Sequence, residues 1–218
     1  MAEQVAVTSQ EQGLPLDAPE PVAQVSAEEY MAHYAHDHYE WEQGRLVKMS
    51  PVTGRHNALT SYFQSLLMAY FALNPIGQFR SEPFVLRLDA VKSYREPDIQ
   101  VILNDNPNSL TDTAMIGPAD ICIEVVSPES VARDYGKKFA EYETGGVKEY
   151  WLIDPIRAEA RISRLSAEGH YQTRQPDAGG YYETPLLPGL RLHIPTLWQD
   201  RLPDFYEVGD AVRTMLAK

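Results

Sequence analysis

The chain has 218 residues, 44% hydrophobic and 23% charged, the composition of one folded domain large enough to bury a core. Its net charge of −12 argues against a broadly basic surface for polyanions, and no run approaches the roughly 20 apolar residues of a membrane span. The N-terminus lacks the pattern of a signal peptide, and a single cysteine, Cys122, excludes an intrachain disulfide. We therefore expect a cytoplasmic protein in which Cys122 has no catalytic role.

The negative charge is distributed unevenly along the chain. Residues 1–50 hold nine acidic residues and two basic ones, which is more than half of the net charge. Residues 51–100 hold five basic residues and four acidic ones. The acidic balance lowers the expectation of nucleic-acid binding without excluding it, because an empty metal site is itself a local cluster of negative charge.

The N-terminal third begins with a segment of low order and continues with a helix and a hairpin. Residues 1–25 are rich in Gln, Pro, Ala and Glu without a period, so we predict a flexible lead-in followed by one domain over 26–218. Ser26 and Glu29 form a capping box that predicts a helix running towards Tyr39. Gln43-Gly44 then predicts the turn of a hairpin.

The rest of the chain alternates between helical and strand-like segments. Apolar residues at three- and four-residue steps predict a long helix over 55–73, ended by Asn74-Pro75. Strands are predicted at 83–88, 97–103, 119–127 and 149–155, and a further helix at 134–146. Shorter strands follow at 161–165, 170–173 and 190–194, with short helices at 195–201 and 210–216. This order predicts an α/β fold with a central mixed β-sheet flanked by helices.

Two carboxylates stand inside apolar strands. Asp98 opens "PDIQVIL" and Glu124 interrupts "ICIEVV". A buried carboxylate must be paired, hydrogen-bonded or metal-bound, because an isolated one costs several kcal/mol. If the two strands are neighbours, both side chains can point to one face and bind Mg²⁺ together with a backbone carbonyl and waters. The ordinary alternatives are a strand-start cap for Asp98 and a buried ion pair with an arginine for Glu124.

Several segments together resemble a known family. These are "YEWEQGRLVKMSP", "EPDIQVIL", "ICIEVVSPES" and "RDYGKKFAEYETGGVKEYWLIDP". They resemble the Uma-two family of restriction-endonuclease-like proteins, in the PD-(D/E)xK nuclease superfamily, over roughly residues 26 to 195. The run from Ile121 to Pro155 is the most specific part. The resemblance implies a restriction-endonuclease-like fold and metal-dependent hydrolysis of phosphodiester bonds in DNA.

The resemblance also implies roles for individual residues. Asp98 and Glu124 take the places of the two acidic metal ligands, and the Val125 carbonyl that of a third ligand. The superfamily lysine expected two residues after Glu124 is Val126 here, which departs from the general pattern. In the Uma-two pattern a lysine on the following helix substitutes, and that position matches Lys138.

Neighbouring residues complete the predicted site. Lys137 would point about 100° away from Lys138, which shares a helix face with Asp134 and Tyr142. Lys138 could also be a solvated lysine. Glu40 matches the glutamate before the first hairpin and is predicted to be catalytic, with Glu42 as an equally acidic neighbour. His56 matches a recurrent histidine, which we interpret as a hydrogen-bonded helix-start residue rather than a ligand.

Other charged clusters support weaker interpretations. Arg45, Lys48, Arg80 and Arg87 could follow a phosphate backbone, or could form the outer faces of strands. The histidines of "HYAHDHYE" (His33, His36 and His38) fit one helix face poorly as a metal site, and we interpret them as solvated.

The leading hypothesis is therefore a Mg²⁺- or Mn²⁺-dependent DNA endonuclease that leaves a 5′-phosphate. The metal would activate a water, and Lys138 would orient or deprotonate that water or neutralise the phosphate. Two cuts on a duplex favour a homodimer. One rival is a catalytically inactive member of the fold that acts as a binding or structural module, which the acidic charge favours. Another is a metal-independent hydrolase with paired carboxylates, such as a glycosidase.

Overall fold

The described part of the chain begins with a short helix packed against a hairpin. The structure, a computed structural model, describes residues 24–35 and 37–217, so most of the predicted lead-in lies outside the described residues. Helix α1 (Ala27–His33) starts after Ser26, whose hydroxyl accepts a hydrogen bond from the N–H of Glu29 at 3.1 Å. The helix start is where the sequence predicts it, but the helix ends at His33 rather than near Tyr39.

The predicted hairpin is present. Strands β1 (Tyr39–Glu42) and β2 (Arg45–Lys48) pair in antiparallel register across Gln43 and Gly44, whose φ angles are 48° and 91°. Two consecutive positive φ angles are the signature of the tight hairpin turns that favour glycine.

The hairpin belongs to the first of two six-stranded sheets. In this first sheet the strand order is β2-β1-β5-β4-β8-β7, and only β4 and β8 pair in parallel. Its other strands are β4 (Val85–Leu88), β5 (Ser93–Arg95), β7 (Ser109–Leu110) and β8 (Ala114–Ile116). A 3₁₀ turn, η1 (Asp89–Val91), connects β4 to β5. Of these four further strands the sequence predicts only β4, because β5, β7 and β8 have two or three residues and are too short to show an alternating pattern.

The central sheet has the order β12-β11-β10-β9-β6-β3. It contains β3 (Gly77–Ser81), β6 (Ile99–Leu103), β9 (Ile121–Val125), β10 (Glu149–Asp154), β11 (Glu159–Leu165) and β12 (Tyr171–Arg174). Strands β9 and β10 are parallel and the other neighbours are antiparallel, so the sheet is mixed, as predicted. Strand β9 is buried along its whole length, which explains its nearly uniform apolar sequence.

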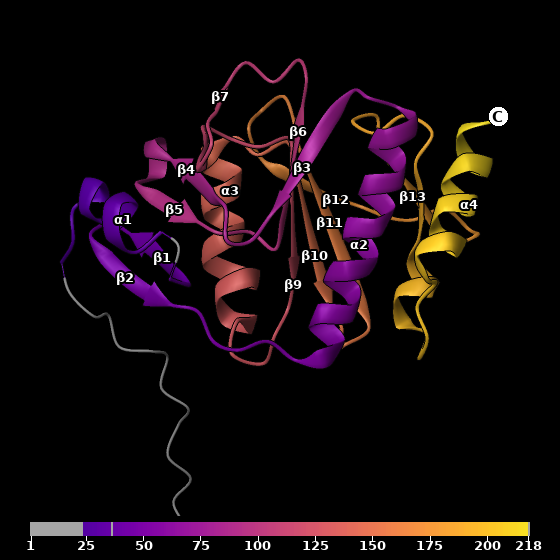
Figure 1. The fold of residues 1–218 in the computed structure, drawn as a ribbon, viewed down its shortest axis with the longest axis horizontal. Coiled ribbons are helices and arrows are strands. Elements are labelled where there is room, and N and C mark those ends of the chain that lie inside the picture. Colours follow the sequence, from indigo (N-terminus) through magenta and orange to yellow (C-terminus); the bar gives the residue numbers. More distant parts are fainter. Residues whose placement is uncertain (1–23, 36, 218) are drawn as a thin grey trace, which may run out of the picture.

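Helices cover the central sheet on two sides (Figure 1). On one side, α2 (Gly54–Leu73) and α4 (Phe205–Leu216) form the larger core with the inward residues of β6, β9 and β10. On the other side, α3 (Phe139–Gly145) lies between the central sheet and the first sheet and shares a second core with β4 and β9. A two-stranded sheet, β13 (Tyr181–Glu183) and β14 (Arg191–His193), and a 3₁₀ helix, η3 (Ile194–Trp198), precede α4.

The helix predicted at 134–146 differs from a regular α-helix at its start. Residues Arg133–Lys138 form a π-helical turn, η2, that continues directly into α3. The helix ends at Gly146, whose φ of 88° suits a glycine C-cap, as the sequence predicts. Wide turns of this kind insert one extra residue into a helix and are frequent at functional sites. In the described residues, no helix combines the length and apolar character needed to cross a membrane.

Candidate active site

A small cavity lies where the ends of β6 and β9 meet the start of α2 and the turn η2. Its volume is about 30 Å³, enough for a water or an ion but not for a nucleotide. Six of its lining side chains are ionisable: His56, Asp98, Glu124, Arg133, Asp134 and Lys138. The three acids and three bases come from four separate elements, so the cavity exists only in the folded chain.

The pairing of β6 with β9 places Asp98 beside Glu124. The two strands are antiparallel with Ile99 opposite Ile123, so the next pair along the ladder is Asp98 and Glu124, and opposite residues share a face. The backbone N–H of Val125 donates to Asp98 Oδ2 at 2.6 Å, which fixes the aspartate against β9. The strand adjacency on which the sequence hypothesis depends is confirmed.

One oxygen of each carboxylate is engaged and the other is open. Glu124 Oε1 accepts a hydrogen bond from Tyr142 at 2.7 Å and lies 2.9 Å from Lys138 Nζ. Glu124 Oε2 and Asp98 Oδ1 accept no hydrogen bond from the described residues, and neither belongs to the fully enclosed atoms without a partner. Both residues line the cavity, and these two oxygens are the ones that the protein leaves without a donor. Burial raises the pKa of Glu124 to about 8, against the opposing effect of Lys138.

Lys138 is enclosed by carboxylates. Its Nζ lies 2.9 Å from Glu124, 3.3 Å from Glu40 and 3.6 Å from Asp134, and the side chain is only 3% exposed. Burial opposes the positive charge, but the three carboxylates outweigh it and raise the pKa of Lys138. The side chain is therefore a fixed ammonium group in the wall of the cavity.

Lys137 has different surroundings, as the sequence predicts. It is half-exposed, pairs with Glu42 and does not line the cavity. The two adjacent lysines thus contact different parts of the molecule, with only Lys138 facing Glu124.

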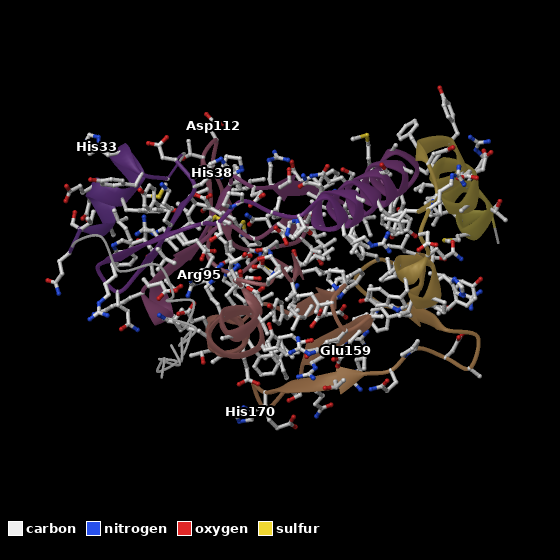
Figure 2. The ribbon with its side chains drawn as sticks, turned by 90° about the horizontal axis from the view of Figure 1, so that it is seen from below. His33, His38, Arg95, Asp112, Glu159 and His170 are labelled. Atoms are coloured by element: carbon white, nitrogen blue, oxygen red, sulfur yellow. The ribbon has the colours of Figure 1, made fainter. Side chains whose placement is uncertain are left out.

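Glu40 lies behind the cavity rather than in it. It is fully buried on β1, and its Oε2 pairs with Arg95 Nη1 at 2.9 Å. Arg95 also pairs with Glu42, and with Glu141 of α3 at 2.6 Å. Burial raises the pKa of Glu40, but Lys138 and Arg95 together lower it to about 2. The predicted catalytic glutamate is thus one contact removed from the cavity, which it reaches through Lys138 and Arg133. Figure 2 shows Arg95 inside the molecule beside α3.

His56 is the hydrogen-bonded helix-start residue that the sequence predicts, and it also lines the cavity. It occupies the first turn of α2, where its N–H donates to the capping Thr53 hydroxyl at 3.2 Å. Its side-chain Nε2 lies 3.2 Å from Asp98 Oδ2, while Nδ1 is buried without a partner among the described residues. Burial lowers the pKa of His56, but the hydrogen bond and charge of Asp98 raise it overall. The signal in the sequence is the match of His56 to a recurrent histidine of the family it resembles.

The donor set fits a hydrated hard cation better than a fully protein-ligated one. Among the described residues, no group of three or more His, Cys, Asp or Glu side chains is arranged to hold a metal. Asp98 Oδ1, Glu124 Oε2 and the backbone at Val125 instead offer a small number of hard oxygens at one cavity. Mg²⁺ commonly binds through one or two carboxylates and keeps several waters or substrate oxygens.

The other predicted clusters do not join this site. His33 and His38 are exposed, and His36 lies outside the described residues. Arg87 pairs with Asp89 at 2.8 Å and lies over the Tyr94 ring. Arg80 lies over the Phe84 ring. Both arginines therefore contact neighbouring side chains, which agrees with the alternative that they form the outer faces of strands.

Comparison with known proteins decides the family. A sequence profile of the family Uma2, described as "Putative restriction endonuclease", matches residues 27–195. The chain belongs to the Uma2 family. This confirms the resemblance drawn from the sequence motifs over nearly the same range. No curated protein matches the chain.

A solved structure supports the fold of this Uma2 chain. It is a crystal structure from Anabaena variabilis, titled as a putative nuclease belonging to DUF820. The TM-score is 0.65 at 19% identity, over 82% of this chain and 98% of that chain. At this identity the similarity shows the fold, which is the restriction-endonuclease-like α/β fold predicted from the sequence.

Proposed function

We propose that this Uma2 chain is a divalent-metal-dependent nuclease that hydrolyses phosphodiester bonds in DNA. The observation that carries the proposal is the pair of oxygens without a protein donor, Asp98 Oδ1 and Glu124 Oε2, on two residues that line one cavity beside a buried ammonium group. Two adjacent carboxylate oxygens without protein donors are a suitable place for a cation or for ordered water. Family membership supports the nuclease class of reaction.

Asp98, Glu124 and the Val125 carbonyl would hold the metal. A divalent ion bound by such oxygens lowers the pKa of a water and stabilises negative charge that develops on a phosphate. The hydrogen bond from Val125 N–H and the contact with His56 occupy Asp98 Oδ2, which would leave Oδ1 for the metal. The Tyr142 hydroxyl donates to Glu124 Oε1, which would leave Oε2 for the metal in the same way.

Lys138 would act as an electrostatic group. Its ammonium lies in contact with three carboxylates, an environment that stabilises the protonated form. A fixed positive charge beside the cavity would neutralise charge on the phosphate in the transition state. Of the three roles considered from the sequence, which are orienting the water, deprotonating it and neutralising the phosphate, this arrangement favours neutralising the phosphate over deprotonating the water.

The rival function is a nuclease fold without activity that binds a partner. The net charge of −12 favours this rival, because DNA binding normally draws on basic surface. A glycosidase-like mechanism has less support, since Asp98 and Glu124 are direct neighbours across two paired strands and share one small cavity. Inverting or retaining glycosidases need a sugar ring between their carboxyl groups.

A matched lysine pair tests the proposal. Supercoiled plasmid is incubated with the wild-type chain, Asp98→Asn, Lys138→Met or Lys137→Met, with Mg²⁺ or Mn²⁺ and with a chelator instead. We expect metal-dependent nicking by wild type and Lys137→Met, and a loss of at least about 100-fold in Asp98→Asn and Lys138→Met. Equal nicking by all four would indicate contamination. No cleavage of DNA or RNA by wild type would favour the inactive fold.

The predicted homodimer is tested separately. Light scattering of the wild-type chain, alone and with a non-cleavable duplex, measures the mass of the particle in solution. A dimer would allow one cavity to address each strand of a duplex. A monomer in both conditions would restrict the chain to single-strand cuts.

A further inference from the structure

The catalytic cavity is too small to contain any part of a nucleotide except a phosphate oxygen, so the rest of the substrate must lie beside it. A second, much larger pocket adjoins the cavity. Its volume is about 480 Å³, and it shares Met49, Ser50 and Val52 with the cavity. The segment between β2 and α2 is therefore the common wall of both.

The backbone fixes the far side of this pocket relative to the catalytic strand. Glu82, which lines the pocket, directly follows β3, and Ser81 at the end of β3 pairs with Ile99 of β6. The N–H of Glu82 donates to the carbonyl of Asp98 at 3.4 Å. A group in this pocket would thus lie next to one held at Asp98.

The lining of the pocket suits a nucleobase better than a phosphate. Met49, Pro51 and Val52 provide apolar surface for the flat faces of a base. Asp37 and Glu82 provide carboxylate acceptors, which would repel a phosphate but can accept hydrogen bonds from the amino group of a base. The Glu82 carboxylate has no hydrogen bond or ion pair with the part of the chain that the structure describes, so it is available as an acceptor.

Donors lie at the same pocket. His38 and Lys48 line it, and the carbonyl of His38 accepts a hydrogen bond from the N–H of Met49 at 2.8 Å, which fixes the two edges of the pocket together. His38 has a φ of 56°, a left-handed conformation that is uncommon for residues other than glycine. Apolar walls with a few convergent polar groups are the usual form of a small-molecule site.

We propose that this pocket, lined by Asp37, His38, Lys48, Met49, Pro51 and Glu82, binds one unpaired nucleobase next to the phosphate being cut. The inference rests on the proposed nuclease function and specifies its substrate class as single-stranded or locally unpaired DNA. A base inside a duplex cannot enter a pocket unless it leaves the stack, which costs a few kcal/mol in a duplex and little in a single strand.

The overall charge of the chain agrees with this substrate class. A protein with a net charge of −12 gains little from broad contacts with duplex phosphates, so affinity must come from local contacts with sugar and base. A base pocket provides such contacts without a basic surface.

Binding without cleavage tests the proposal. Fluorescence anisotropy measures the affinity of the wild-type chain, in excess chelator, for a single-stranded oligonucleotide of about 12 nucleotides. The comparison ligands are the same length of abasic strand, which has equal charge, and the blunt duplex of the same sequence. We expect the base-bearing single strand to bind at least about tenfold more tightly than both. Equal affinity for the abasic strand, or tighter binding of the duplex, overturns the proposal.

A variant pair locates the effect in the pocket. Cytosine carries an amino group that Glu82 could bind and thymine does not, so wild type should bind oligo(dC) severalfold more tightly than oligo(dT) at pH 8. Glu82→Ala should abolish this preference. Glu183→Ala, which removes a surface carboxylate at the distant strand β13, should keep it. A preference unchanged by Glu82→Ala, or absent in wild type, places the base elsewhere.

The outcome is separable from that of the nuclease proposal. Base-dependent binding without metal-dependent cleavage would leave the pocket as a nucleic-acid site on an inactive fold. If the chain cleaves plasmid but binds abasic and base-bearing strands with equal affinity, the proposed base pocket is wrong and the proposed nuclease function stands.

Discussion

Two glutamates of the central sheet stand in similar sequence contexts and have opposite surroundings. Glu149 begins "EYWLID" on β10, and Glu124 interrupts "ICIEV" on the neighbouring strand β9. Both are buried, Glu149 completely and Glu124 with 3% exposure. By the argument applied to the sequence, either one could be a metal ligand.

Their hydrogen bonds separate them. Glu149 Oε1 accepts from Arg164 and Thr184, both at 2.7 Å, and Oε2 accepts from Trp151 at 2.8 Å and Tyr182 at 3.0 Å. Both of its oxygens are therefore saturated by protein donors, whereas Glu124 has donors on Oε1 alone and lines a cavity. Burial in an apolar strand is thus common to both glutamates, and Glu124 differs in having one oxygen without a protein donor and in lining a cavity.

The largest effect expected from this difference is on catalysis. Glu124→Gln should lower the rate of plasmid nicking about 1000-fold, or about 4 kcal/mol of transition-state stabilisation, because an amide binds a divalent ion poorly. Glu149→Gln, assayed at a temperature where it is folded, should stay within about threefold of wild type. Equal losses in both variants would show that the comparison does not separate a functional acid from a structural one.

Stability should show the reverse order. Glu149→Gln should lower the free energy of unfolding by about 2 to 3 kcal/mol, because a glutamine cannot accept all four hydrogen bonds and leaves Arg164 without its counter-charge. Glu124→Gln should change it by less than about 1 kcal/mol, since Lys138 keeps Glu40 and Asp134. Urea titrations at neutral pH measure both, as midpoint shifts at constant slope. A larger loss in Glu124→Gln would contradict the comparison.

Metal should stabilise the two variants differently. Mn²⁺ at ten times its Kd should raise the free energy of unfolding of wild type and of Glu149→Gln by about 1.4 kcal/mol, by mass action on the folded state. In Glu124→Gln the same concentration should have no effect. Thermal scans with and without Mn²⁺ provide the measurement, and calorimetry supplies the Kd. Equal stabilisation of Glu124→Gln would place the ion elsewhere.

The smallest effects concern the tyrosines that donate to each glutamate. Tyr182→Phe should lower the free energy of unfolding by about 1 kcal/mol and leave the Mn²⁺ Kd unchanged. Tyr142→Phe should weaken Mn²⁺ binding severalfold, because the hydroxyl that holds Oε1 also orients Oε2. Calorimetric titration of both variants distinguishes these outcomes. An unchanged Kd in Tyr142→Phe would mean that packing alone orients Glu124.

The sequence predicts the framework of the site because its main elements are long or uniform. The apolar strand around Glu124 and the periodic helix α2 can each be recognised from their own stretch of sequence. The motif resemblance distinguishes Lys138 from Lys137. Cross-strand pairing then follows from adjacency of β6 and β9.

The remaining features depend on contacts between distant segments. Arg95 lies on β5, a strand of three residues, and its ion pairs reach 55 residues back to Glu40 and 46 residues forward to Glu141. The role of His56 depends on how the start of α2 meets the start of β6. No local sequence pattern predicts such packing. None distinguishes Glu149, whose two carboxylate oxygens both accept hydrogen bonds, from Glu124, which has one oxygen without a protein donor. The π-helical turn at η2 likewise has no signal in the sequence, because "RDYGKK" is compatible with an ordinary helix.

The docking of this helix against the first sheet has a consequence for the design of smaller variants. Four ion pairs join the helix to that sheet: Arg133 and Lys138 with Glu40, Lys137 with Glu42, and Glu141 with Arg95. No strand of the first sheet lines the cavity, so a minimal catalytic fragment drawn from cavity residues alone would discard it. Such a fragment would keep Lys138 and its contacts with Glu124 and Asp134 but lose the ion pairs that join its helix to the first sheet. Trimming the N-terminal hairpin, or transplanting the central sheet into another scaffold, would therefore weaken the positioning of the amine even though every cavity residue was retained.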